Sequence, residues 1–519
     1  MEEYGLDELA ASAEAVLAGL GPLAVQLAGL AVQAGRAVTL DAMEVLVAER
    51  GRELLRGLVQ RALDGQAERE VRLPQVTGSD GVRRACAERG HARTVVTRLG
   101  AVKVRRIGYR SKVKGVPSLF PRDAVLNLPP GGYSWALQRL AEMFCRSGSY
   151  EQAHEFVLAV TGVSTGRRQL QQIMAAAAAD AERFCQDRDQ DAVPRAGQEQ
   201  EQGLPLGISA DGKGVAMRPE ARRPETARKA GKRPGQAFGK RLGTGQKSGC
   251  KRIAETGVVF DVIPPEEPRT PEQVMGRAPG QAPPEGPRAV NRWYTAQITV
   301  SCAETIAMLF DQAERRDPGH ERTWIALADG ANHQIDVITA QAAARDVEVT
   351  ILIDFIHVIE YLWKAAWCFC PARDPAAEDW VTTQGLAILH GQVTQVISTI
   401  SALAAADPPP PGSEHAKIIR TTLGYLAAKQ PYLDYPRALA NGWPIATGVI
   451  EGACRHLIAD RMGITGARWG LQGAQSMLWL RAIAASGDHD AYWDWHITQE
   501  NHRNHRSRYQ DPASLGLAA

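Results

Sequence analysis

Between residues 204 and 370, short apolar segments alternate with segments of helical periodicity in an order that few folds allow. The apolar segments have the length and composition of buried strands and cover 204–210, 253–261, 293–300, 323–328 and 347–353. The helical patterns cover 303–316, 332–344 and 355–369. The order is therefore three strands followed by helix, strand, helix and strand. This order predicts a mixed α/β sheet flanked by helices.

Three of these apolar segments lead directly to an aspartate. Asp211 follows "PLGISA", Asp329 follows "WIALA" and Asp354 follows "VEVTILI". A single aspartate at such a place is usually a turn or helix-cap residue, and Asp211-Gly212 is also a strong β-hairpin signal. However, open α/β sheets bind ligands at the carboxyl edge of their strands. Three aspartates in one predicted sheet therefore favour a shared site at that edge.

A fourth acid, Glu451, lies in the first turn of a predicted late helix that follows Pro444. The small residues around it, in "GVIEG", would let its carboxylate approach the sheet. Carboxylates that lie close together repel one another and raise one another's pKa. A divalent cation removes this conflict, and hard oxygen ligands select Mg²⁺ or Mn²⁺. Two such ions can activate an attacking oxygen and stabilise a leaving oxygen at a phosphodiester.

The order of the acids along the chain matches that of ribonuclease H-like DDE transposases. Several stretches resemble the ISKra-four family of bacterial insertion-sequence transposases within that group. They are "LNLPPGGYS", "SADGKGVAMRPEA", "WIALADGANHQI", "NGWPIATGVIEGACRHLIADRMGITGARWGLQGAQSMLWLRAI" and "YWDWHITQENHRNHRSRY". The resemblance implies a ribonuclease H-like catalytic domain. It also implies that Asp211, Asp329 and Glu451 are the catalytic triad and hold two Mg²⁺ or Mn²⁺ ions.

The resemblance has further implications for the surroundings of the triad. Mutator-like relatives carry a Cys- or Asp-x-x-His signature after the second aspartate, and "DFIH" supplies Asp354 and His357. These two residues are expected to shape or support the site, although a structural histidine facing a helical insertion is an equal alternative. Asp354, Glu360 and Asp460 are rivals of Glu451 as the third acid. The family often has a cysteine knuckle within the region of residues 109–121, but no cysteine occurs there, and no zinc site is predicted.

The chain is long enough for two to four domains, and we expect a multidomain protein of α+β and α/β class. The uncharged stretch 15–35 is interrupted by Gly21-Pro22 and is expected to form a soluble helix pair rather than a membrane span. The acidic start predicts no signal peptide. The expected regions are an N-terminal helical region (1–75), a basic β-hairpin segment (76–130), a helical, helix-turn-helix-like DNA-binding region (131–190), a catalytic domain (204–370 and 441–485), an all-α insertion (371–440) and a C-terminal tail (486–519).

A net charge of only +2 means that DNA binding must depend on local clusters of basic residues. The segment 149–174 has the spacing of a helix-turn-helix. Its second helix offers side chains that can bond base edges in the major groove, namely Arg167, Arg168, Gln169 and Gln172. The alternative is that these helices only brace the catalytic domain. In that case a predicted hairpin at 92–109, with one cationic face around Arg105 and Arg106, would read the DNA.

Two further segments offer basic residues close to the predicted site. The glycine-rich stretch 218–252 is too polar to pack, so we expect it to be mobile in the free protein and to lie along a DNA backbone, unless it is only solvated. Its candidate contacts are Arg222, Arg223, Lys232 and Arg233. The loop "GITGARWG" offers Arg468 for a phosphate and Trp469 for a stack on a base or on the core.

The sequence thus predicts a DDE transposase that binds terminal inverted repeats, cuts the element's ends by metal-dependent hydrolysis and joins the 3′-hydroxyl to target DNA. The expected partner is double-stranded DNA without a membrane, and two or more copies would pair the ends. Eight scattered cysteines without a C-x-x-C pair fit a cytoplasmic, nucleoid-associated protein. Two alternatives remain, namely a nuclease of the same fold that cuts without joining and a DNA-binding protein whose triad is inactive.

Overall fold

The computed structural model describes residues 18, 21, 22, 25, 39–190, 203–225, 228, 250–276, 285–371, 373–464 and 466–513. The chain forms two compact units. The first unit contains Met1–Asp180 together with Asp490–Ala519, and the second contains Ala181–His489. The C-terminal segment that we expected as a separate tail therefore belongs to the first unit. The boundaries of the smaller domains stay predictions.

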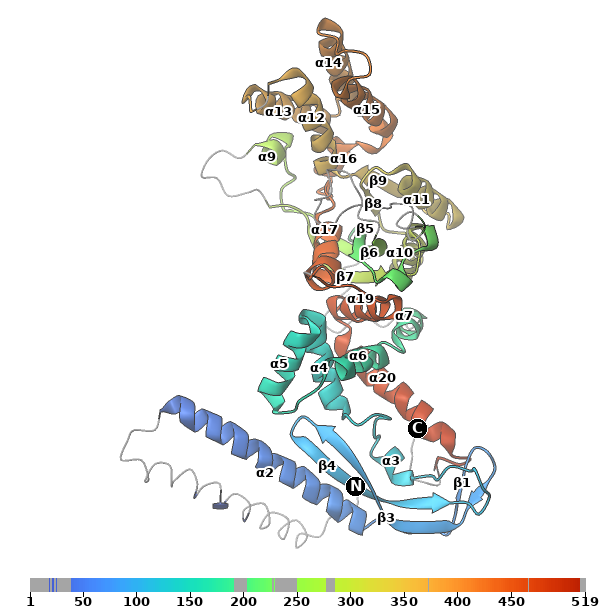
Figure 1. Ribbon diagram of the computed structural model, residues 1–519. Coiled ribbons are helices and arrows are strands. Elements are labelled where there is room, and N and C mark those ends of the chain that lie inside the picture. Colours follow the sequence, from blue (N-terminus) through green and yellow to red (C-terminus); the bar gives the residue numbers. More distant parts are fainter. Residues whose placement is uncertain are drawn as a thin grey trace. The chain divides into compact units, whose positions relative to one another are not determined.

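The second unit is built on a mixed sheet of five strands (Figure 1). The strands are β5 (Leu206–Ala216), β6 (Lys251–Ile263), β7 (Arg288–Gln297), β8 (Trp324–Ala328) and β9 (Val349–Ile353). Their order across the sheet is β7-β6-β5-β8-β9. β6 is antiparallel to both β5 and β7, whereas β8 is parallel to both β5 and β9. The predicted mixed sheet is confirmed, and its first strand occupies the middle position.

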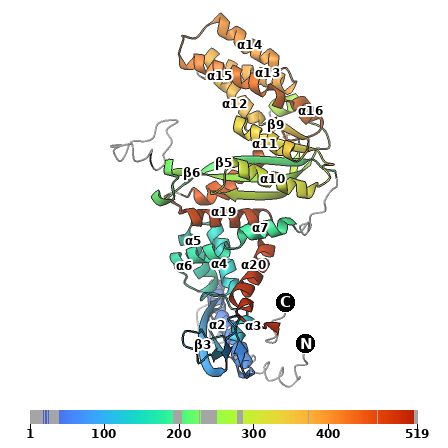
Figure 2. The same cartoon turned by 90° about the vertical axis from the view of Figure 1, so that its right-hand side faces the viewer.

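Helices cover both faces of this sheet. The helical elements of this unit outside the insertion are α7 (Ala181–Gln190), η1 (Pro219–Ala221), α9 (Pro271–Met275), α10 (Cys302–Arg316), α11 (Asn332–Ala344), α17 (Gly448–Ala453), the π-helix η3 (Cys454–Ala459), α18 (Asp460–Met462) and α19 (Leu471–Ala485), of which α9 packs against the insertion. Leu206, Ile208 and Ala210 of β5 pack into one apolar core with residues of α10 and α11. Because side chains alternate along a strand, Ser209 and Asp211 point to the other face. α19 lies beside the sheet (Figure 2).

The segment predicted as an all-α insertion is helical. After α12 (Phe355–Phe369), it contains α13 (Ala376–Leu389), α14 (Val393–Ala406), α15 (Glu414–Lys429), η2 (Gln430–Tyr432) and α16 (Tyr435–Ala440). Leu362, Val381, Val396 and Leu426 are buried, one from each of the four longest of these helices. The insertion therefore has its own apolar core.

The first unit combines a long helix, two β-hairpins and a group of short helices. Its elements are α2 (Leu40–Glu68), β1 (Val76–Thr77), β2 (Arg83–Arg84), β3 (Cys86–Thr97), β4 (Gly100–Arg110), α3 (Pro121–Val125), α4 (Trp135–Ser147), α5 (Tyr150–Thr161), α6 (Arg167–Ala177), α20 (His489–Asn504) and η4 (Arg506–Arg508). The C-terminal segment joins this unit through a β-bridge between Gly78 and Tyr509. No helix among the described residues of either unit is both long enough and apolar enough to cross a bilayer.

The prediction that Asp211 ends the first strand is wrong. β5 continues to Ala216 and stays paired with β6 as far as the pair Ala216–Lys251, so Asp211-Gly212 does not form a hairpin turn. Gly212 lies opposite Glu255, and a side chain there would meet Ile253 at 2.7 Å. The glycines of "DGKG" therefore serve close packing against β6 rather than a turn. The parallel pairing with β8 does end at Ser209, so Asp211 lies just beyond it.

The prediction that Arg105 and Arg106 lie on one cationic face of the hairpin is also wrong. β3 and β4 form the predicted hairpin, but Arg105 and Arg106 are neighbours on β4 and so point to opposite faces. Arg105 forms an ion pair with Asp64 at 3.6 Å. Arg106 is largely buried, forms an ion pair with Asp123 and lies 4.1 Å above the ring of Phe120. Of these two arginines only Arg105 is exposed, on the same face of β4 as Lys103.

Candidate functional site

Asp211 is partly buried on the α17 side of the sheet, and both of its carboxylate oxygens are engaged. Oδ1 accepts a hydrogen bond from the Gly212 amide at 2.6 Å. Oδ2 accepts one from the thiol of Cys454 at 3.3 Å. Burial raises the pKa of the Cys454 thiol to about 12, and the negative charge of Asp211 adds to this effect. The thiol therefore stays protonated and fastens Asp211 to the helical segment that follows Glu451.

Asp329 is tied to the strand of Asp211 by a single buried side chain, that of Gln334. The Gln334 amide nitrogen donates to the carbonyl of Ala210 at 2.7 Å, and its oxygen accepts from the Asp329 amide at 3.3 Å. The carboxylate of Asp329 accepts from the Ala331 amide at 2.8 Å. The residue before Asp211 and the backbone of Asp329 are thus bridged at the same edge of the sheet.

Asp354, His357 and Glu451 form a compact group in which each residue offers one ligand atom and these atoms all lie within 4.8 Å of one another. Asp354 is fully buried and caps α12 by accepting from the Ile356 amide at 2.8 Å. Its other oxygen accepts from the hydroxyl of Thr447, the residue directly before α17. The start of the Glu451 helix is therefore fastened to the end of β9.

The three predicted catalytic acids are distributed over two neighbouring clusters. Asp211 and Asp329 are connected through Gln334, whereas Glu451 joins Asp354 and His357. The triad itself is not a group with all ligand atoms within 4.8 Å among the described residues. Of the two other rivals for the third acid, Glu360 lies 3.6 Å from His357 at the border of the second cluster, and Asp460 belongs to neither cluster. Glu360 contacts Lys364 at 3.9 Å, and Asp460 contacts Arg455 at 3.8 Å.

Two residues of the site were missed by the sequence interpretation, namely Glu255 and Cys302. Burial raises the pKa of Glu255, and the charge of Asp211 adds to this rise. Burial also raises the pKa of the Cys302 thiol to about 11, with further contributions from Glu255, Asp329 and Asp211. Three acids thus act on one thiol at the start of α10. For Glu255 the sequence offered one signal, namely a charged residue in the interior of the strand segment "IAETGVVFD".

Gly330 provides a test of how tightly the Asp329 turn is held. Its φ is +90°, and a Cβ atom there would lie 2.6 Å from the Tyr425 hydroxyl oxygen. We expect Gly330→Ala to destabilise the protein by about 1–3 kcal/mol, because a left-handed conformation is costly for alanine. Gly424→Ala, at an open position in α15, should instead stabilise the protein by about 0.5–1 kcal/mol. Urea unfolding measures both, and a change of equal sign would contradict the expectation.

In the first unit, α5 and α6 lie where the helix-turn-helix was predicted. α5 ends at Gly162 in a left-handed conformation, and α6 begins five residues later. Leu170, Ile173 and Met174 of α6 are buried. Its candidate DNA contacts are all exposed, namely Arg167, Arg168, Gln169 and Gln172. Arg167 also contacts Glu151 of α5 at 3.0 Å. The exposed face of α6 is therefore polar and accessible.

Arg168→Ala tests whether this face reads bases. If Arg168 bonds a guanine, binding to the native terminal repeat should weaken by about 1–3 kcal/mol, while binding to scrambled DNA of equal length should change little. Gel-shift titrations on both DNAs measure the difference. Equal weakening on both would make Arg168 a phosphate contact, and no weakening on either would remove α6 from the interface.

The predicted DNA contacts of the second unit are only partly described by the structure. Arg223 and Arg468 are exposed and Arg222 is half-buried, whereas Lys232 and Arg233 lie outside the described residues. The stack of Trp469 on a base is contradicted, because its ring is buried. Its indole nitrogen donates to the Met462 carbonyl at 3.1 Å, so the core alternative holds. The backbone of Trp469 pairs with the end of β5 and places Arg468 beside the beginning of the basic stretch.

A second acidic and histidine group lies in the first unit and consists of Asp180, His496 and Glu500. His496 Nδ1 lies 2.8 Å from an oxygen of Asp180. Arg503 donates to the carboxylates of both Asp180 and Glu500. The positive charge that this group requires is thus supplied by an arginine. The group is an ion-pair network that joins α20 to the residues that follow α6.

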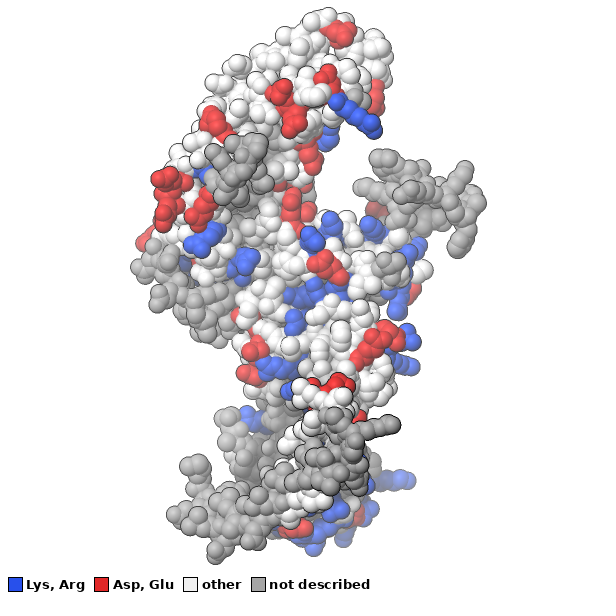
Figure 3. Space-filling view, turned by 90° about the vertical axis from the view of Figure 1, so that its left-hand side faces the viewer, with Lys and Arg blue, Asp and Glu red and all other residues white. Residues whose placement is uncertain are grey.

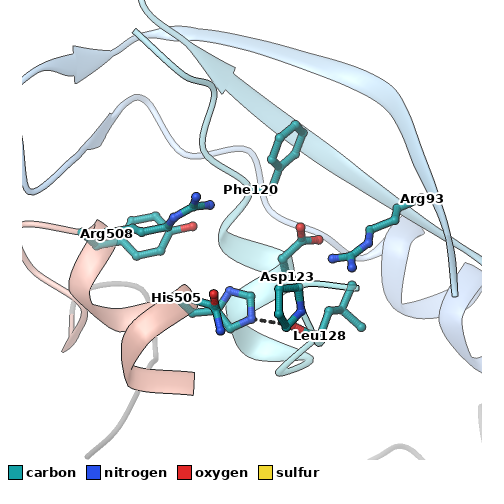
Figure 4. A pocket seen from close by; sticks show the side chains of 9 residues that line it. Arg93, Phe120, Asp123, Leu128, His505 and Arg508 are labelled. Atoms are coloured by element: carbon teal, nitrogen blue, oxygen red, sulfur yellow. Dashed lines mark hydrogen bonds between the residues drawn. The ribbon is translucent and has the colours of Figure 1, made fainter. Parts of the chain in front are cut away.

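The first unit also encloses a cavity of about 180 Å³ between α3, the β3–β4 hairpin and the C-terminal segment (Figure 4). Arg93, Asp123 and His505 lie around it. Arg93 donates to the carbonyls of Pro129 and Gly131, and a ring nitrogen of His505 lies 2.7 Å from the Leu128 carbonyl. Asp123 already pairs with Arg106. The side chains of Arg93 and His505 thus bond to backbone carbonyls, whereas Asp123 Oδ1 is buried without a hydrogen-bond partner among the described residues.

Comparison of the chain with protein-family models gave no match, and comparison with curated proteins gave no significant match. The resemblance to the ISKra-four family therefore rests on the quoted stretches alone.

Proposed function

We propose that the protein is a DDE transposase whose second unit contains a ribonuclease H-like catalytic domain. The observation that carries this proposal is the position of the acids in the sheet. β5, which bears Asp211, lies directly beside β8, which leads to Asp329. Glu451 follows on a helix that contacts the same side of β5 through Cys454. The proposal requires this arrangement, because acids from the first strand, the fourth strand and a late helix must share one site.

The donor groups fit the metal ions that such an enzyme needs. Asp211, Asp329 and Glu451 supply carboxylate oxygens, which are preferred by Mg²⁺ and Mn²⁺. Burial raises the pKa of Glu255, and the negative charge of Asp211 adds to this rise. When bound, two divalent ions would activate the attacking oxygen and stabilise the leaving oxygen of a phosphodiester.

The protein's own residues would hold the acids in place before DNA arrives. Cys454 orients Asp211, and Gln334 fixes the turn that carries Asp329. Thr447 and Asp354 anchor the helix that carries Glu451. Neighbours of this kind hold metal ligands in one orientation, and their removal commonly costs 10–100-fold in metal affinity or activity. The site is therefore organised by hydrogen bonds that do not depend on the substrate.

The DNA would be held mainly through its phosphates. On the face of the second unit shown in Figure 3, Lys and Arg side chains gather over the part that holds the sheet, whereas acidic side chains are more frequent over the insertion helices. The exposed Arg223 and Arg468 belong to the elements next to Asp211. Contacts of this type give affinity that falls with salt and does not depend on base sequence. Base reading would come from α6 of the first unit.

A strand-transfer assay tests the proposal. The protein is incubated with Mg²⁺, a labelled duplex that carries the terminal repeat found beside its gene, and a target plasmid. A transposase should nick the repeat end and join the label to the plasmid. Nicked ends without joined product would indicate a nuclease that only cuts. Binding without either product would indicate a DNA-binding protein whose acids are inactive.

A further inference from the structure

Asp354 is a fully buried carboxylate, and no lysine or arginine among the described residues forms an ion pair with it. It lies at the end of β9 with no exposed surface. Its hydrogen bonds come from neutral donors, the Ile356 amide and the Thr447 hydroxyl. Buried charges in proteins are normally paired with an opposite charge or bound to a metal ion. A buried carboxylate at the position of Asp354 is therefore expected to have a cation beside it.

Two groups next to Asp354 can complete such a site. His357 follows one turn along α12, and Glu451 comes from α17. One ligand atom from each of the three residues lies within 4.8 Å of the others, as ligands of a single ion do. The His357 ring lies 3.6 Å from Glu360, which is too long for a hydrogen bond. One imidazole nitrogen and two carboxylates are therefore available together.

Contacts within the protein hold each of these three residues in place. The bonds of Asp354 to Ile356 and Thr447 leave each carboxylate oxygen with a free lone pair. Thr447 also fixes the beginning of the Glu451 helix. His357 is set by the same first turn of α12 that Asp354 caps. The three ligands thus come from the N-terminal turns of α12 and α17, and the hydrogen bond between Thr447 and Asp354 connects these two turns.

The group in the first unit contains the same types of side chain, but a nearby arginine compensates their charge. There, Arg503 contacts both Asp180 and Glu500 and supplies the positive charge. In the group around Asp354 no guanidinium takes this place among the described residues. The two groups have the same composition, and they differ in the source of the compensating charge.

We infer that Asp354, His357 and Glu451 form a binding site for a divalent first-row transition-metal ion, with His357 as a direct nitrogen ligand. Nitrogen ligands favour transition metals over Mg²⁺, so the site takes Mn²⁺ in preference to Mg²⁺. The inference deepens the proposed function, because Glu451 belongs to both, and it gives Asp354 and His357 a role as metal ligands rather than as support.

The test is the binding of Mn²⁺ to the full-length protein without DNA, followed by electron paramagnetic resonance. Wild-type protein should bind Mn²⁺ more tightly than Mg²⁺, and its pulsed spectrum should show coupling to an imidazole nitrogen. His357→Ala should lose this nitrogen coupling and at least about tenfold in Mn²⁺ affinity, while Mg²⁺ affinity should change less. Asp354→Asn should also weaken Mn²⁺ binding, and its circular dichroism spectrum reports whether it folds.

His390→Ala is the matched control, since His390 is exposed on the same unit and contacts only Glu272 at 3.0 Å among the described residues. It should leave both the nitrogen coupling and the Mn²⁺ affinity unchanged. A wild-type spectrum without nitrogen coupling, or a coupling that survives in His357→Ala, would overturn the inference. Neither readout involves DNA, so a failure of strand transfer with intact nitrogen coupling would refute the proposed function alone.

Discussion

Asp211→Asn should reduce DNA cleavage by about a thousand-fold or more and leave DNA binding largely unchanged. The substitution keeps the shape of the side chain but removes the negative charge that would hold a metal ion. Metal ions supply several kcal/mol of charge stabilisation in phosphoryl transfer, and each 1.36 kcal/mol corresponds to a factor of ten in rate. Cleavage of a labelled repeat end under single-turnover conditions measures the rate, and a gel shift measures binding.

Asp336→Asn is a suitable control for this experiment, because Asp336 is exposed on α11 and belongs to neither acidic cluster. It should cleave at the wild-type rate. A rate for Asp211→Asn close to that of the control would remove Asp211 from the catalytic site. A parallel loss of DNA binding would instead indicate that the substitution disturbs the fold.

Asp180→Ala should destabilise the first unit by about 3 kcal/mol. The substitution leaves the buried His496 and one side of Arg503 without their acidic partner. Breaking a buried ion pair from one side typically costs about 3–5 kcal/mol, and the lower end applies because Arg503 is nearly half exposed. Urea unfolding followed by tryptophan fluorescence measures the loss. Asp490→Ala, in an exposed pair with Arg139, should cost less than about 1 kcal/mol.

The network of Asp180, His496 and Arg503 should also make the stability of the protein depend on pH in the acidic range. Burial alone would raise the pKa of Asp180, but the hydrogen bond and charge of His496, together with Arg503, outweigh it and lower the pKa below its ordinary value of 3.8. When folding lowers the pKa of a carboxyl group, the group stabilises the protein at pH values above its pKa in the unfolded chain. This stabilisation is lost as the pH falls through its pKa in the folded protein. Wild-type stability should therefore fall more steeply below about pH 4 than that of Asp180→Asn. Parallel curves would contradict this role for Asp180.

The strands and helices of the second unit could be predicted from the sequence because their apolar periodicity is local. The course of the chain at Asp211 could not, because "DGKG" contains the residues of a turn. Only the pairing with β6 keeps Asp211 and Gly212 extended. The hairpin differs in this respect, because the alternation that places Arg105 and Arg106 on opposite faces is local and follows once both residues are assigned to one strand.

The supporting residues of the site were beyond sequence reasoning because their partners are distant along the chain. Cys454 and Asp211 are 243 positions apart, and Gln334 and Ala210 are 124 positions apart. A buried thiol and a buried amide have no distinctive local pattern. Asp354 was found from its place after an apolar strand and His357 only through the resemblance, and their compact grouping with Glu451 required the structure.

The first unit is assembled from both ends of the chain, and this has a consequence for its biosynthesis. Asp180 leaves the ribosome before the roughly 300 residues of the second unit, and its partner His496 follows them. At roughly 5–20 residues per second, the interval is about 15–60 s. During this time the second unit can fold, whereas the first lacks α20. Protease digestion of ribosome-bound chains should therefore find the second unit resistant first. The helices proposed to recognise DNA would therefore reach their final packing only after α20 has been synthesised.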